Sequence, residues 1–104
     1  MEISTDIQEA NLILQGYSGA KFQIVMYSST LRRIALKLTL TDVQEVVYVV
    51  GIGCESINGR FDNKDAKLHI TEEVKEGEVT SVIADKSGQF TLTTNSGFTL
   101  AKGV

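Results

Sequence analysis

Cysteine is scarce in this sequence, and proline and tryptophan are absent. The single cysteine, Cys54, excludes an internal disulfide and favours a reducing, cytoplasmic setting. Together with the single histidine, His69, it falls short of the three or four ligands that a zinc site needs. We therefore expect no metal and no cofactor. The absence of proline, in a sequence rich in turns, has no physical explanation that we can give.

An excess of basic residues and a long apolar run are also missing. Ten Lys and Arg against thirteen Asp and Glu give a formal charge of −3, which leaves no basic stripe for nucleic acid. No apolar run approaches the ~20 residues of a membrane-spanning helix. The start, MEISTDIQEA, lacks the basic end and apolar segment of a signal peptide. We therefore expect a cytoplasmic protein that binds neither nucleic acid nor membranes.

Alternation of apolar and polar residues, with a period of two, runs through most of the chain. In residues 33–41 the even positions are large aliphatics, from Ile34 to Leu40, as in a half-buried strand. Shorter segments repeat this pattern between turn signals such as Asn58-Gly59. Their inward positions are Phe22, Ile24 and Met26; Leu68 and Ile70; Val79, Ser81 and Ile83; Phe90 and Leu92; Phe98 and Leu100.

These segments predict a single all-β domain over residues 1–104. Seven to eight short strands at even spacing are typical of a small antiparallel barrel or sandwich with mostly meander connections. Leu12 and Leu14 begin a weaker strand. The first ten residues fit either a short helix, with Thr5 and Gln8 in capping-box spacing, or a frayed end.

The most apolar run, VVYVVGIGCESING at residues 46–59, contains two glycines where a core strand would keep its β-branched residues. Gly51-Ile52-Gly53 supplies two glycines of a dinucleotide-binding loop, but Ser56 stands at the third position and no helical pattern follows. We interpret the two glycines as shaping the strand. They permit either the close approach of a covering element or a sharp bend.

The same run suggests an interaction surface. If its even positions, from Val46 to Cys54, face the core, its odd positions form an outward face that is also apolar. A strand that is apolar on both faces is usually covered on both, here by the N-terminal segment or by another chain. We therefore predict a non-enzymatic module for protein interaction or self-association, with a homo-oligomer or a protein partner as its expected state. The predicted interface residues are Val25, Tyr27, Val47, Val49, Gly51 and Gly53.

Two alternative functions stay open. A small barrel could hold an apolar or amphipathic ligand in its interior. A small hydrolase could use Cys54 as its nucleophile, or the carboxylates of Asp62 and Asp65. No catalytic constellation is complete, because Cys54 and His69 are expected on opposite sides of the sheet. The ligand-binding residues of the barrel alternative are Phe22, Met26, Tyr48, Phe90 and Phe98.

Overall fold

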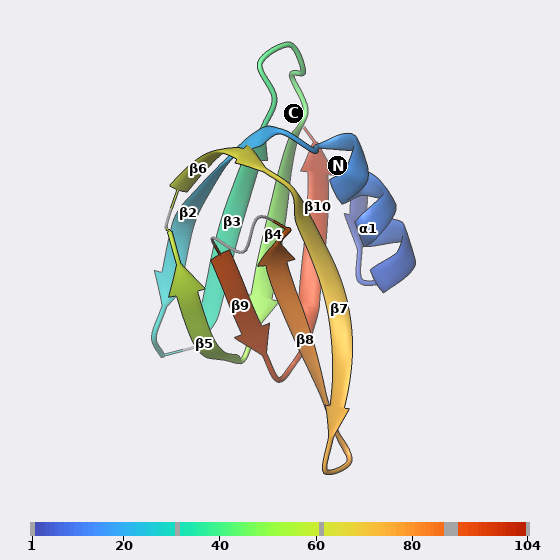
Figure 1. Cartoon of the computed structure of the whole chain (residues 1–104), viewed down its shortest axis with the longest axis vertical. Coiled ribbons are helices and arrows are strands. Elements are labelled where there is room, and N and C mark those ends of the chain that lie inside the picture. Colours follow the sequence, from blue (N-terminus) through green and yellow to red (C-terminus); the bar gives the residue numbers. More distant parts are fainter. Residues whose placement is uncertain (1, 31, 61, 87–89, 104) are drawn as a thin grey trace.

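The computed structural model describes residues 2–30, 32–60, 62–86 and 90–103, except for the side chains at 62–64 and 75. The chain is mostly β-structure, with 65% strand and one short helix, in two antiparallel sheets (Figure 1). These sheets do not close into a barrel. The prediction of an all-β fold is confirmed, but the described residues form ten strands, more than the seven to eight expected.

We call the larger sheet A and the smaller one sheet B. Two meanders, at residues 20–52 in sheet A and 68–94 in sheet B, make up most of the structure. Of the other connections between described strands, four cross between the sheets, and one joins two strands of sheet A through the helix. Sheet A has the order β1 (Glu2–Ser4), β10 (Phe98–Gly103), β4 (Val46–Ile52), β3 (Arg33–Thr39), β2 (Ala20–Ser28) and β6 (Asp62–Ala66). Sheet B has the order β5 (Cys54–Gly59), β9 (Phe90–Thr94), β8 (Glu78–Asp85) and β7 (Leu68–Lys75).

The core lies between the two sheets, and sequence alternation explains which residues fill it. On β3, Ile34, Leu36 and Leu38 are buried, as the period of two predicts. The rings of Phe22 on β2 and Phe90 on β9 meet across the core, with centroids 4.7 Å apart. Burying one such side chain contributes about 1.5–3 kcal/mol. Apolar contact between the sheets is therefore the main interaction that holds them together.

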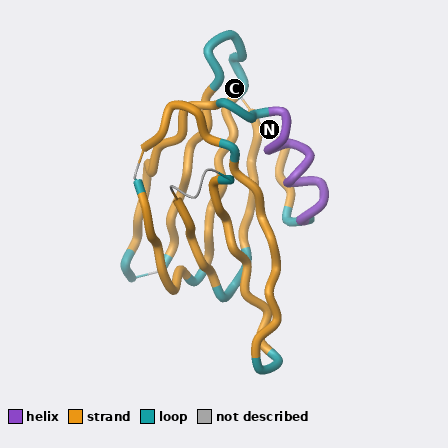
Figure 2. The backbone as a smooth tube through the Cα atoms, viewed as in Figure 1, coloured by secondary structure: helices purple, strands orange, loops and turns teal. Residues whose placement is uncertain are grey.

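Helix α1 (Ile7–Gly16) lies beside β7 at the edge of sheet B (Figures 1 and 2). Asp6 caps the helix by accepting a hydrogen bond from a backbone N–H of the first turn, at 3.1 Å. Ala10 and Leu14, one turn apart, are both buried. The strand predicted from Leu12 is therefore wrong, because these residues follow the period of a helix. With ten residues, the described helix is too short to cross a membrane.

The chain passes from sheet A to sheet B at one of the two glycines of the apolar run. Gly53 has φ +69°, in the left-handed region that favours glycine, and it separates β4 from β5. The single strand expected over residues 46–54 is therefore wrong. Gly51 allows close packing instead, since a Cβ there would lie 2.9 Å from Cγ2 of Thr94. Both roles inferred from the sequence are therefore present, since Gly53 allows the sharp bend and Gly51 allows the close approach of another strand.

Candidate interaction surface

Strand β4 is apolar on both faces, but its orientation is the reverse of the prediction. Val47 and Val49 are 0% exposed and belong to the core. The cause is strand pairing, because Val49 lies opposite Leu36 and must share its inward face. The half-buried residues on the other side of β4 are Val46, Tyr48, Val50 and Ile52. The predicted interface residues that are buried instead are Val47, Val49, Gly51 and Gly53.

The side of sheet A that faces away from sheet B carries an apolar band, which we call the outer face. Strand pairing places Met26, Ala35 and Val50 in one row, and a second row joins β1, β10 and β4. No described element packs over this side, since α1 lies beside the sheets (Figure 1). The apolar residues of the outer face are Ile3, Met26, Ala35, Val46, Tyr48, Val50, Ile52 and Ala101, of which Ala35 is only 7% exposed.

Strand β2 adds exposed apolar side chains because it contains a bulge. Its register with β3 shifts between Ile24 and Met26, which leaves Val25 as the extra residue. The bulge interrupts the alternation of inward and outward side chains along β2. Val25 and Tyr27 are exposed, but Tyr27 lies opposite the inward Ile34, so its predicted place on the outward face is wrong. Met26, which alternation assigns to the core, is instead 45% exposed.

The charged side chains on the outer face of β3 are basic. Lys37 lies opposite Tyr48 of β4, and Arg33 lies opposite Ile52. The chain as a whole has thirteen acidic residues and a formal charge of −3, so these two cations stand out against an acidic background. An apolar band flanked by cations is complementary to a surface that is apolar and acidic.

A second apolar feature is a groove of about 380 Å³ between β2 and β5. Cys54 lies in this groove, half-buried, and burial raises the pKa of its thiol above the usual value. Its Sγ donates a weak hydrogen bond to the backbone carbonyl of Gly51, at 3.7 Å. A thiol that stays protonated at neutral pH is a poor nucleophile. The groove is lined by Ile24, Tyr27, Ile34, Cys54, Glu55, Ser56, Ile57 and Leu92.

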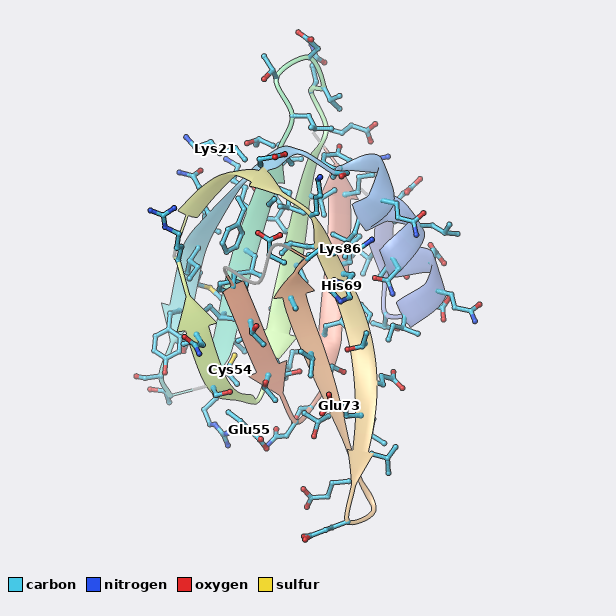
Figure 3. All side chains as sticks on the ribbon, in the orientation of Figure 1. Lys21, Cys54, Glu55, His69, Glu73 and Lys86 are labelled. Carbon is cyan, nitrogen blue, oxygen red and sulfur yellow. The ribbon has the colours of Figure 1, made fainter. Side chains whose placement is uncertain are left out.

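His69, the other member of the possible catalytic pair, lies far from Cys54 (Figure 3). Cys54 begins β5 and His69 belongs to β7, and these strands are the two opposite edges of sheet B. His69 lines a pocket of about 370 Å³ between α1 and β7, together with Lys67 and Lys86. Its Nδ1 atom is buried and has no hydrogen-bond partner among the described residues. The cysteine and the histidine therefore do not form a nucleophile and base pair.

The remaining candidate residues do not form a site either. Asp65 is exposed on β6, and the side chain of Asp62 lies outside the described part of the chain. The described residues contain no group of three or more His, Cys, Asp or Glu that could hold a metal ion. The five residues proposed to bind a ligand inside a barrel do not lie together. Phe22, Phe90 and Phe98 fill the core, while Met26 and Tyr48 lie on the outer face.

Comparison with protein-family models, with curated proteins and with solved structures finds no significant match to this chain. Among the surfaces described above, the outer face is the one that spans five strands of sheet A.

Proposed function

We propose that this domain is a self-association module in which a second copy of the chain covers the outer face of sheet A. The observation that carries the proposal is the apolar band across β1, β10, β4, β3 and β2, over which no described element packs. Apolar sheet faces are normally buried, and uncovered ones mark contacts between proteins. In this proposal the two sheets form a sandwich with one side left free for assembly.

A second copy offers the chemistry that complements this face. Lys37 and Arg33 flank the apolar band, so a covering surface should be acidic as well as apolar. The chain itself has such a segment at residues 72–78, with four glutamates, one lysine and two valines nearby at 74 and 79. Association between identical chains is also the commonest route to a stable assembly of soluble domains.

The variant Val50→Lys tests this proposal. Val50 is half-buried near the middle of the outer face, so a lysine there would place a charge in the contact and leave the core intact. We expect the wild-type protein to exceed its monomer mass of 11.3 kDa in sedimentation experiments, increasingly at higher concentration. The variant should keep the native circular dichroism spectrum, and its association constant should fall at least about tenfold, as for a central contact residue.

Val82→Lys is the matched control. Val82 is also half-buried, on the outer side of β8, a middle strand of sheet B, where it lies opposite Thr71 and Thr93. This control should associate as the wild type does. A wild-type protein that stays monomeric at every concentration, or a Val50→Lys protein that associates normally, would show that the proposal is wrong.

A further inference from the structure

The hairpin of β7 and β8 projects beyond the end of the two-sheet core (Figure 1). Its last strand pair is Lys75 with Glu78, and the turn between them is Glu76-Gly77. Both turn residues have positive φ, +52° and +80°, as in the tight turns that match the twist of a hairpin. The molecule is elongated, with extents of 43, 26 and 25 Å, and the loop between β3 and β4 projects at the opposite end (Figure 1). The hairpin is an ordered, paired structure that can act as a docking element.

One side of this hairpin is apolar and uncovered. Val74 and Val79 lie directly opposite each other and are 70% and 52% exposed. By the period of two, they are on the same side of sheet B as the buried Ile70 and Ile83. They therefore continue the core-facing side past the point where sheet A ends, and no described residue of the same chain buries them.

The hairpin is also acidic. Glu72 is exposed and lies on the same side as Val74, two residues away along β7. Three more glutamates lie within the next six residues. Their negative charges repel one another, and an opposing cationic surface relieves that repulsion. The charged residues from 72 to 78 are Glu72, Glu73, Glu76 and Glu78, with Lys75 as the one cation.

We propose that the valine side of this hairpin in one copy docks on the outer face of sheet A in the next copy, an inference that rests on the self-association proposed above. Val74 and Val79 pack against the row of Met26, Ala35 and Val50, and Glu72 approaches Lys37 or Arg33. The two surfaces are complementary both in their apolar side chains and in their charge, because an apolar, acidic hairpin meets an apolar, basic face.

The contact is heterologous, because the docking element and the receiving face are different parts of the chain. An open assembly then has one free hairpin at one end and one free face at the other, so it grows until it closes into a ring or extends as a filament. A two-fold dimer joined face to face, in contrast, would stop at two copies and would leave both hairpins unused.

The test mixes two variants, each of which lacks one half of the contact. Val79→Lys disables the hairpin and Val50→Lys disables the face, and each protein alone should be monomeric. In a mixture, the intact hairpin of the Val50→Lys chain can dock on the intact face of the Val79→Lys chain. We expect a one-to-one heterodimer in sedimentation velocity, with one chain labelled by a fluorophore, and no growth beyond two copies at higher concentration.

Thr80→Lys is the control for the hairpin, because Thr80 is adjacent to Val79 but lies on the other side of β8. It should associate as the wild type does. If Val79→Lys associates normally while Val50→Lys is monomeric, the outer face binds a different surface, and only the hairpin inference is wrong. If the mixture of the two variants stays monomeric, the hairpin inference is likewise overturned. Normal association of Val50→Lys would instead overturn the self-association proposal itself.

Discussion

Gly51 lies beneath two side chains of β9, and its lack of a side chain is what allows them to pack there. A Cβ at this position would lie 2.9 Å from Cγ2 of Thr94 and 3.0 Å from Cδ2 of Leu92, and both of those residues are 0% exposed. We therefore expect Gly51→Ala to lower the free energy of unfolding by about 1–3 kcal/mol, the usual cost of overpacking. Urea denaturation measures this change directly.

Gly16→Ala is the control for that measurement. Gly16 ends α1 and is exposed, and a Cβ added there would meet no described atom within 4 Å. Alanine there should be neutral or should stabilise the fold by up to about 1 kcal/mol, because it is the better helix former. A Gly51→Ala protein as stable as the Gly16→Ala protein would mean that β9 can move away from β4 at little cost.

Elements differ in how well the sequence predicts them, and β3 and β4 show why. β3 has leucine and isoleucine on one side only, so its inward face follows from alternation alone. In β4 every residue from Val46 to Val50 is apolar, so alternation does not reveal which set is inward. The inward side of β4 is fixed by its pairing with Leu36 and Leu38 of β3. This pairing buries Val47 and Val49, which are predicted from the sequence to lie on the outward face.

The outer face can be inferred from sequence only in part. The sequence predicts a second apolar side of β4, opposite the core, and such a side exists, although different residues form it. The exposure of Met26 depends on a bulge that no sequence signal indicates. The acidic cluster at residues 72–78 is typical of a solvated hairpin. The exposure of the valines at 74 and 79 cannot be predicted from the sequence, because it depends on where sheet A ends.

At the edge of sheet B, one side chain of α1 takes the place of a neighbouring strand. The Asn11 amide donates from Nδ2 to the carbonyl of Ile70 and accepts at Oδ1 from the N–H of the same residue, both at 2.8 Å. Asn11→Ala would leave both partly buried backbone groups of Ile70 without these partners. We expect a loss of about 1–3 kcal/mol in the free energy of unfolding, with faster hydrogen exchange at the Ile70 amide.

Gln15→Ala, a substitution of an exposed amide on the same helix, should change stability by less than about 0.5 kcal/mol. If Asn11→Ala were as mild as this control, water would satisfy the β7 edge as well as the asparagine does. In that case the apolar contacts of α1, chiefly those of Ala10 and Leu14, would hold the helix in place.

For the whole molecule, an assembly that joins acidic hairpins to basic faces should depend on salt. Raising sodium chloride from about 0.1 to 1 M shortens the screening length from about 10 to 3 Å. We expect the association constant to fall several-fold over this range, measured by sedimentation equilibrium. Lys37→Met, which removes one cation beside the apolar band, should make this dependence shallower. An association constant that does not change with salt would leave the apolar contacts as the whole basis of assembly.

The strand order of sheet A means that one of its inner strands is synthesised last. β10 follows the other nine strands in the chain, yet it lies between β1 and β4. Until residues 98–103 leave the ribosome, β4 has β3 on one side and an unpaired, valine-rich edge on the other. An uncharged edge of this kind is prone to aggregation while folding is incomplete. The growing chain should therefore be most dependent on chaperones during the interval between completion of β4 and arrival of β10.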